Sequence, residues 1–295
     1  MLSGTGPAAQ LEKRRITVIQ HLPAVGQGLR DHGLVPLVFL RKDNATDRGA
    51  FYGSQEAMDT AMDQWKKSHT GPWTTFACQL GIGYFKSDKI TASDEFKMLP
   101  ADEQEFLLQD TVPHHEFLTH FPYHMLVRHW PQEHMNYSCL LVFLLNGQSR
   151  GEVTLQLSNP DDPLLFDPKM LSHPFDCRVA VEATRHLLQV VKHPAFIKDN
   201  VAELIGPRSE SEEDLLEFWR ENICSSFHMT GTVKIGKVDD VDAGVDSKFR
   251  VLRIDCLRVA DMSVVPLLPN NHPQATAYVT GVSCAETLIE EYNLA

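Results

Sequence analysis

The middle of the chain contains two apolar runs joined by a short turn. Ser138 to Leu145 is almost continuously apolar, Gly151 to Leu157 alternates between apolar and polar residues, and Asn146 to Arg150 is a five-residue connection that contains a glycine. A connection of this length with a glycine is typical of antiparallel neighbours. The sequence therefore predicts a β-hairpin, and with it an antiparallel sheet, in the middle of the chain.

The two ends of the chain follow a different pattern. Near the start, a helical pattern from Ala8 to Arg15 and a β-branched run from Ile16 to Ile19 lie between glycine-rich turns. Near the end, a strand pattern from Ile254 to Ala260 precedes a long helical pattern from Pro273 to Tyr292. Such alternation is typical of α/β segments. We therefore expect a mixed α/β (α+β) fold, in which the chain leaves one domain and later returns to it.

Further helices are predicted between these regions. Each is recognised from apolar residues at helical spacing or from a residue that can cap a helix. The predicted helices are Ser54 to His69, Pro100 to Gln109, Ser172 to Val191, and a helix that starts at a capping box in Ser209 to Glu212 and runs to Glu221. They are expected to flank the antiparallel sheet.

Composition excludes several classes of protein. The 295 residues carry a formal net charge of −12, which repels phosphate, so a nucleic-acid partner is not expected. The longest strongly apolar run, Cys139 to Leu145, is far shorter than the ~20 residues that cross a bilayer, so no membrane partner is expected either. Met1 to Arg15 lacks the pattern of a secretory signal, and no compartment is predicted.

The six scattered cysteines favour free thiols over a disulfide framework.

One histidine lies in a segment suited to catalysis. Ser225 to Thr232 surrounds His228 with serine, threonine and glycine, whose small side chains let other groups approach closely. Imidazole titrates near neutral pH, so His228 is a candidate general base. A lone histidine in such a segment is also compatible with an ordinary surface position.

A second candidate lies where the last predicted helix begins. Asp261, Met262 and Ser263 follow a predicted strand, and His272 precedes Pro273 and Gln274 at the start of the helix. The N-terminus of a helix presents unpaired N–H groups and a partial positive charge, which favours an anion. The alternative is that the segment only caps the helix.

Several histidines between residues 114 and 134 suggest a metal site at first sight. Pro113, Pro122 and Pro131 interrupt the stretch, and its spacing matches no common zinc pattern. We therefore predict no metal ligands here and expect these side chains to pack or to line a pocket. The histidines are His114, His115, His120, His124, His129 and His134.

A set of motifs, in order along the chain, resembles the C-terminal part of the glucose–methanol–choline oxidoreductase family, particularly its aryl-alcohol-oxidase-like members. The likeness runs from residue 2 to about residue 292. The segments that carry it are Leu2 to Pro7, Val25 to His32, Gly71 to Thr74, Ser149 to Leu155, Ser172 to Asp176, His228 with Gly231 and Thr232, Leu257 to Ser263, and Asn271 to Gln274.

The resemblance implies a FAD-dependent enzyme that acts on small-molecule alcohols. By analogy, His228 takes the hydroxyl proton, His272 binds the same oxygen, and a hydride passes to the flavin. Asp261, Met262, Pro273 and Gln274 would lie along the cofactor. The implied domains are a remnant of the FAD-binding domain at 1–35, a substrate-binding domain at 36–225, and a return to the FAD-binding domain at 226–295.

One feature of the family is missing from the sequence. No G-x-G-x-x-G follows a strand pattern, so the first βαβ unit that would hold the cofactor's pyrophosphate is not expected in this chain. A truncated enzyme, one of two chains with the missing unit supplied separately, and a non-catalytic remnant that acts as a binding module all remain open. Oxidation of an alcohol is expected of the truncated enzyme and of the two-chain enzyme, and not of the remnant.

Overall fold

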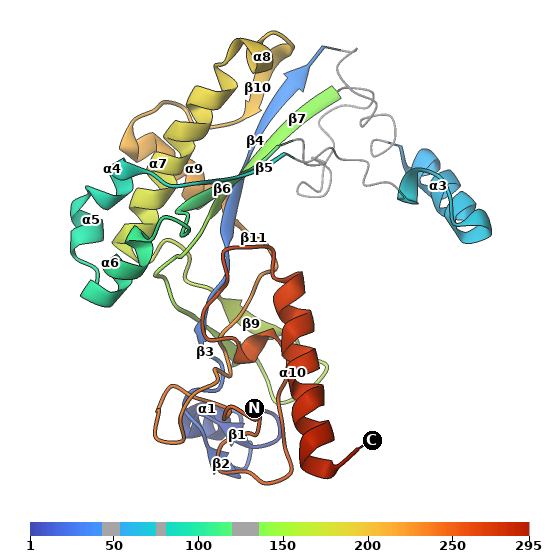
Figure 1. Ribbon diagram of the computed structural model, residues 1–295, viewed down its shortest axis with the longest axis vertical. Helices are drawn as coiled ribbons and strands as arrows, with labels where there is room; N and C mark the ends of the chain where they lie inside the picture. Colours follow the sequence, from blue (N-terminus) through green and yellow to red (C-terminus); the bar gives the residue numbers. More distant parts are fainter. Residues whose placement is uncertain (43–53, 75–80, 120–135, 295) are drawn as a thin grey trace. The chain divides into compact units, whose positions relative to one another are not determined.

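The computed structural model describes residues 1–42, 54–74, 81–119 and 136–294, which form two compact units (Figure 1). Unit 1 comprises Met1–Gly33, Asn146–Asp176 and Ser225–Ala295, and unit 2 comprises Leu34–Leu145 and Cys177–Cys224. The predicted mixed fold with antiparallel sheets and flanking helices is confirmed. The predicted functional division at residues 35 and 225 stays a prediction, and the structure adds residues 146–176 to the unit that contains both ends.

Unit 2 is built on an antiparallel sheet with strand order β10-β4-β7-β6-β5. These strands are β10 (Asn200–Ile205), β4 (Gly33–Arg41), β7 (Asn136–Leu144), β6 (His115–Leu118) and β5 (Ile82–Phe85). The two-residue β11 (Cys224–Ser225) lies where the chain leaves this unit. Apolar side chains of β4, β6 and β7 are buried against one another, because β4 pairs along most of β7 and β6 pairs with its last four residues.

Helices account for most of the remaining described residues of unit 2. They are α3 (Gln55–Ser68), η1 (Pro72–Thr74), α4 (Asp88–Thr91), α5 (Asp94–Lys97), α6 (Ala101–Leu108), α7 (Pro174–Val191), α8 (Pro194–Ile197) and α9 (Glu212–Asn222). The indole N–H of Trp219 in α9 donates to Oγ1 of Thr184 in α7 over 2.7 Å, and both side chains are fully buried. A single buried hydrogen bond therefore connects helices α7 and α9.

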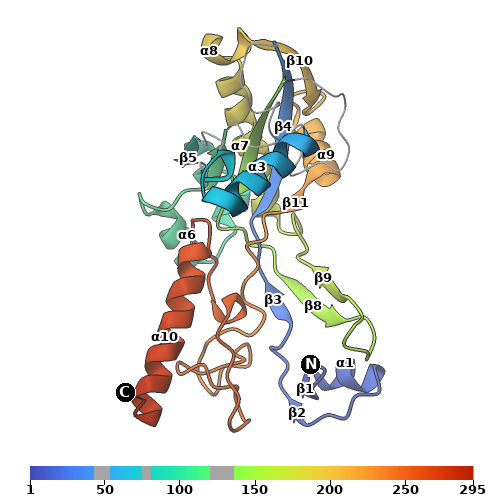
Figure 2. The ribbon, with the colours of Figure 1, turned by 90° about the vertical axis from the view of Figure 1, so that its right-hand side faces the viewer.

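Unit 1 contains two small sheets and a long terminal helix (Figure 2). Its elements are β1 (Thr5–Gly6), α1 (Ala8–Lys13), β2 (Gln20–His21), β3 (Gln27–Leu29), β8 (Gly151–Leu155), β9 (Leu164–Asp167), η3 (Met262–Val264) and α10 (Gln274–Tyr292). β1 and β2 pair in parallel, and the order β3-β8-β9 is antiparallel. Residues 146–176 belong to this unit because β8 pairs with β3.

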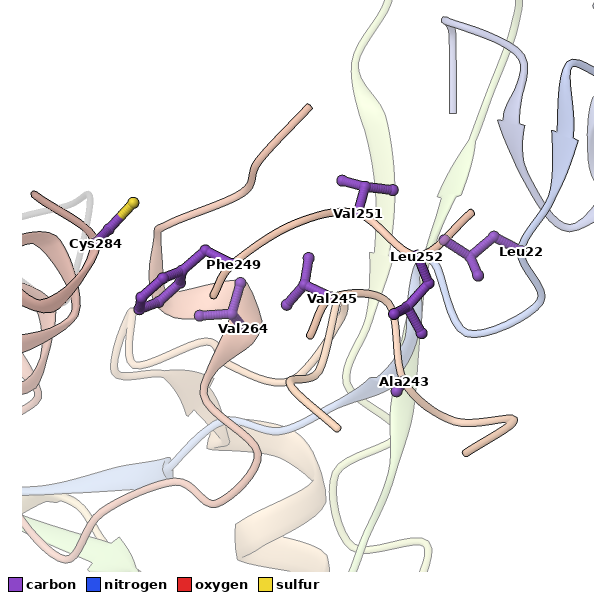
Figure 3. Close-up of a cluster of buried hydrophobic side chains, with 8 residues drawn as sticks. All are labelled: Leu22, Ala243, Val245, Phe249, Val251, Leu252, Val264 and Cys284. Atoms are coloured by element: carbon purple, nitrogen blue, oxygen red, sulfur yellow. The ribbon is translucent and has the colours of Figure 1, made fainter. Parts of the chain in front are cut away.

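The core of unit 1 is formed mainly by irregular segments. Figure 3 shows Phe249 and Val264 beside Cys284 of α10, with Leu22 at the other end of the cluster. The remaining buried members come from one loop: Ala243, Val245, Val251 and Leu252. The loop therefore anchors η3 and α10, which bear predicted site residues, through apolar burial rather than through a sheet.

The predicted hairpin between residues 138 and 157 is wrong, although both runs are strands. β7 pairs with β4 and β6, so neither of its edges is available to β8. The connection is held by Asp176 instead, whose carboxylate accepts the backbone N–H groups of Gln148 (2.6 Å) and Ser149 (2.8 Å). Residues 146–150 therefore connect unit 2 to unit 1 and do not form a hairpin turn.

Two predicted strands are also absent where expected. From Ile254 to Ala260 the backbone forms turns, because Arg253 and Cys256 adopt left-handed φ angles of 62° and 59° that interrupt an extended strand. From Ile16 to Ile19 no strand forms, and the parallel pairing begins one residue later, at Gln20 opposite Thr5. The later run pairs only through an isolated antiparallel bridge between Arg250 and Arg258, which is too short to form a strand.

The predicted helices are confirmed, with small shifts at their ends. Ser54 caps α3 by accepting the N–H of Ala57. For α9 the cap is Ser211, which accepts the N–H of Asp214, rather than Ser209 of the predicted capping box. Pro273 occupies the N-cap of α10 rather than its first turn. In the described part of the chain, every helix is too short or too polar to span a bilayer.

Candidate functional site

Two distant segments of unit 1 run side by side and form the base of the site. Arg30 and Thr230 exchange two backbone hydrogen bonds, of 3.1 and 3.0 Å, and form an antiparallel bridge. The N–H of Ser226 donates to the carbonyl oxygen of His32 over 3.3 Å. The glycine-rich turn near the start of the chain is thus fixed against the segment that carries His228.

The carboxylate of Asp31 strengthens this connection. Its Oδ1 accepts the backbone N–H of His228 over 3.0 Å and the hydroxyl of Ser226 over 3.2 Å, and its Oδ2 accepts the hydroxyl of Ser225. Burial raises the pKa of Asp31, while the hydrogen bonds from Ser225, His228 and Ser226 act in the opposite direction. The backbone at His228 is therefore held by a half-buried acceptor.

His32 and His228 form a buried pair. Nδ1 of His32 lies 3.0 Å from Nδ1 of His228, and their rings meet edge to face. His32 is 2% exposed and His228 is 8% exposed. Burial lowers the pKa of His32 to about 3, with a smaller contribution from the charges of His228 and His272. His32 is therefore neutral at neutral pH.

His272 adjoins this pair. Its ring centroid lies 4.9 Å from that of His228, at an angle of 78°. Burial, followed by the nearby His272, lowers the pKa of His228 to about 4, so its imidazole is neutral at neutral pH and has a lone pair. His272 itself is exposed, directly before the N-terminal end of α10. The two histidines singled out in the sequence thus meet in one place.

The predicted cofactor residues lie on two neighbouring elements, η3 and α10. Asp261 caps η3 by accepting the N–H of Ser263 over 2.8 Å, and Met262 is the half-buried first residue of that turn. Pro273 and Gln274 begin α10, whose first turn has no side-chain cap among the described residues. The N–H groups at this end of the helix are therefore available to a ligand.

A cavity of about 280 Å³ opens beside the paired segments that contain Arg30 and Gly231. Among its lining residues are two glycines and four charged residues: Gly28, Gly231, Arg30, Arg150, Lys234 and Asp242. Gly28 and Gly231 have φ angles of +76° and +89°, and a Cβ on Gly231 would lie 2.8 Å from the carbonyl oxygen of Gly28. The two glycines thus bring bare backbone to the wall of the cavity.

Sequence reasoning missed two residues of this site. Asp31 and His32 end the turn from Val25 to His32, which was interpreted only as a turn and as part of a family motif. The signal that could have identified them is an acidic residue next to a histidine in a glycine-rich turn. Their partner, His228, is 196 positions from His32 and 197 from Asp31, so nothing local indicates the contact.

The histidine-rich stretch lies in unit 2. His114 and His115 are buried, and Nε2 of His115 lies 3.1 Å from Nδ1 of His186 in α7. His120, His124, His129 and His134 are outside the described residues. Among the residues that are described, no group of three potential metal ligands converges.

Comparison with protein families matches residues 147–281 to the C-terminal family described as GMC oxidoreductase. A dehydrogenase from Emericella nidulans is 31% identical over 98% of this chain and 46% of its own length. Patulin synthase from Aspergillus clavatus is 31% identical over 94% of this chain and 44% of its own length. The chain therefore spans about half the length of these relatives.

Solved structures share the fold over nearly the whole chain. A formate oxidase from Aspergillus oryzae, studied for its FAD modification, has a TM-score of 0.86 at 25% identity and covers 99% of this chain and 52% of its own. A fungal aryl-alcohol oxidase has a TM-score of 0.75 at 24% identity, with 99% and 52% coverage. At that identity the second likeness concerns the fold alone.

Proposed function

Because this chain belongs to the glucose–methanol–choline (GMC) oxidoreductase family, whose C-terminal domain model matches residues 147–281, we propose that it is one part of a FAD-dependent oxidoreductase that oxidises the CH–OH group of a small alcohol. His228 and His272 are the proposed catalytic pair. The activity is a proposal for the complete protein, since this chain spans about half the length of its relatives.

The convergence of the two imidazoles carries the proposal. His228 and His272 come from a loop and from the segment before α10, yet their ring centroids lie 4.9 Å apart. Two imidazoles at this distance can both reach one hydroxyl oxygen. His228 is itself buried, and a third buried imidazole, that of His32, contacts it.

Each histidine has a distinct proposed task. His228 is neutral at neutral pH because burial lowers its pKa to about 4, so it can accept the hydroxyl proton. Negative charge that develops on the substrate oxygen favours the protonated ring and raises this pKa as the reaction proceeds. His272 is proposed to donate a hydrogen bond to the same oxygen. General acid–base catalysis of this kind contributes about 10²–10⁴ in rate.

The residues around the site fit a flavin. Buried polar atoms without a hydrogen-bond partner in the described part of the chain include Nε2 of His32, Oγ1 of Thr230 and Oδ1 of Asn270. The bare backbone of Gly28 and Gly231 lets a flat ring approach closely. When bound, FAD would accept the two electrons that leave the donor carbon.

Four residues are proposed to hold the cofactor. Asp261 and Met262 on η3 would lie along it, together with Pro273 and Gln274 at the start of α10. The uncapped N–H groups of α10 favour negative charge at this end of the helix, so they would stabilise the reduced cofactor.

The outer side of α10 supports the proposal that further polypeptide completes the protein. Tyr278, Val282 and Ile289 are 71%, 55% and 51% exposed, and their spacing of four and seven residues places them on one side of the helix. Thr280 and Cys284 are buried on the opposite side. A helix with apolar residues on both sides is normally covered on both. The half of the relatives' length that this chain does not span is the proposed cover, in the same polypeptide or as a separate chain.

The test is reconstitution with that missing part. The chain is co-expressed with a polypeptide that corresponds to the uncovered half of its relatives, and flavin absorbance is followed during anaerobic addition of alcohols. Formate, which is not an alcohol, is added in a separate experiment, because one structural relative is a formate oxidase. The expected result is a yellow protein that an alcohol bleaches.

Variants separate the proposed roles from mere folding. His228→Ala is expected to retain flavin and to bleach about 10²–10⁴-fold more slowly. His69→Asn is the matched control, because His69 is exposed in unit 2 with a left-handed φ of 54° that asparagine tolerates. Unchanged bleaching in His228→Ala would contradict the proposal.

The alternative is a non-catalytic remnant that acts as a binding module. It predicts a folded, colourless protein even when the missing half is present. The buried pair His32 and His228 would then be only a packing contact, and exchanging His228 for alanine would change stability without any spectroscopic effect.

A further inference from the structure

We propose that His32 is a positioning residue that determines which nitrogen of His228 carries the proton. In this arrangement His228 donates its Nδ1–H to Nδ1 of His32, which leaves Nε2 of His228 unprotonated. The inference rests on the proposed role of His228 as the base, and it adds a third histidine to the site.

The contact itself restricts the protonation states. Two Nδ1 atoms 3.0 Å apart can share one proton, so one ring donates and the other accepts. If His32 donated, the proton of neutral His228 would be on Nε2, and its only lone pair would be occupied by His32. Such a ring could not accept a proton from a substrate. If His228 donates, its lone pair is on Nε2 and the ring can act as a base.

The step after proton transfer also requires His32 to accept. Once His228 has taken up a proton, both of its nitrogens are N–H donors, and Nδ1 still faces His32. A buried cationic donor needs an acceptor. His32 stays neutral because burial and the neighbouring His228 and His272 disfavour a second positive charge, in agreement with its pKa of about 3. The same hydrogen bond therefore serves before and after the transfer.

The backbone leaves His32 little freedom to take another position. Its carbonyl accepts the N–H of Ser226, and the preceding Asp31 accepts the N–H of His228. The carboxylate of Asp31, the residue before His32, accepts from the backbone of His228 and from the hydroxyls of Ser225 and Ser226. His272 is a further titratable group beside the pair.

The proposed arrangement has one cost. Nε2 of His32 would carry a proton, and it is buried without an acceptor in the parts of the chain that the structure describes. The opposite arrangement would avoid this cost but would leave His228 unable to act as a base. The two proton placements therefore make opposite predictions, and they can be distinguished directly.

Nitrogen NMR of the chain with isotope-labelled histidine side chains tests where the proton of His228 lies, and it does not require turnover. The signals of His228 are assigned by their loss in His228→Gln. The expected result at neutral pH is a protonated Nδ1 and an unprotonated Nε2 in His228, with a coupling across the Nδ1–Nδ1 hydrogen bond. A protonated Nε2 in neutral His228 would overturn the inference.

Two substitutions at His32 test whether this residue affects the rate of the proposed reaction in the reconstituted enzyme. His32→Leu removes the acceptor, whereas His32→Asn can place its amide oxygen close to the position of Nδ1. We expect kcat/KM to fall about 100-fold in His32→Leu, the lower end of what general acid–base catalysis contributes, through kcat more than KM. His32→Asn should recover most of this loss. Equal losses in both variants would contradict a positioning role.

A matched control removes a histidine from the pair of His115 and the half-buried His186 in unit 2. His186→Leu removes the Nδ1 that contacts Nε2 of His115 in unit 2 and should leave kcat and the NMR signals of His228 unchanged. If His32→Leu does not fold, His32→Asn and the NMR of the native chain still decide the question.

The outcomes separate this inference from the proposed function. Loss of turnover in His228→Ala, together with a protonated Nε2 in native His228, would overturn the inference and leave the proposed function in place. Unchanged turnover in His228→Ala would overturn the proposed function, and with it the catalytic meaning of His32, whatever the NMR result.

Discussion

The backbone N–H of His228 donates to Oδ1 of Asp31 over 3.0 Å, between segments that are 197 positions apart. The same carboxylate accepts the hydroxyls of Ser225 and Ser226. Asp31→Ala therefore leaves several partly buried donors without an acceptor, and we expect it to lower the free energy of unfolding by about 1–3 kcal/mol. Urea denaturation followed by circular dichroism measures this loss.

A second aspartate serves as the control for that change. The side chain of Asp94 is 93% exposed and pairs with Lys97 on the surface, where an ion pair contributes at most about 1 kcal/mol. Asp94→Ala should therefore shift the urea midpoint much less than Asp31→Ala. Equal shifts would mean that Asp31 does not anchor the segment of His228.

The contact between Trp219 and Thr184 makes a prediction for unit 2. Thr184→Val keeps the shape of the side chain but leaves the buried indole N–H without its acceptor, so we expect a loss of about 1–3 kcal/mol in the free energy of unfolding. Adding Trp219→Phe removes the orphaned donor. The cycle of the two single variants and the double variant should show a favourable coupling energy between Thr184 and Trp219. If the losses in free energy of unfolding were strictly additive, the hydrogen bond would not be the cause of the loss in Thr184→Val.

Two glycines are expected to respond in opposite directions. Gly231→Ala forces a side chain at φ +89° and puts its Cβ 2.8 Å from the carbonyl oxygen of Gly28, so a loss of about 1–3 kcal/mol is expected. Gly281→Ala lies inside α10, where a Cβ meets nothing within 4 Å, and should stabilise the chain by about 0.5–1 kcal/mol. Thermal denaturation of both variants checks the contrast, which would fail if both changes had the same sign.

Stability should fall as the pH is lowered from neutral. The folded-state pKa values of His32 and His115 are about 3, below the ordinary 6.5, because both rings are buried. The unfolded chain therefore binds protons first, and stability present above pH 6.5 is lost as the pH falls toward the folded values. Each such histidine contributes up to ~1.4 kcal/mol per pH unit.

A substitution isolates this effect from the titration of carboxylates. His115→Phe should show a shallower dependence of the free energy of unfolding on pH between 6.5 and 4, and its ring can pack beside Phe85 and Phe117 as the imidazole does. Urea denaturation at several pH values measures the slopes. Identical slopes in the native chain and in His115→Phe would show that titration of His115 does not contribute to the pH dependence of stability.

Local signals predicted the helices well. Ser54, the acidic first turns and the helical spacing of apolar residues act within a few positions, and α3, α6, α7, α9 and α10 form close to where they were expected. Strand pairing was predicted poorly. The pattern of the run that became β7 says that it is buried, but its neighbours are β4 and β6 rather than β8, because pairing depends on which edges are available in the folded sheet.

The same division holds for the site. The sequence alone determined that His228 and His272 are candidates, because each lies in a short segment whose composition and family resemblance can be recognised locally. Only the tertiary structure decided that their rings meet, that Asp31 holds the backbone of His228, and that His32 is its partner. A hydrogen bond between residues almost 200 positions apart leaves no periodic or compositional trace, because it depends on how segments of a unit pack and not on the residues beside each histidine.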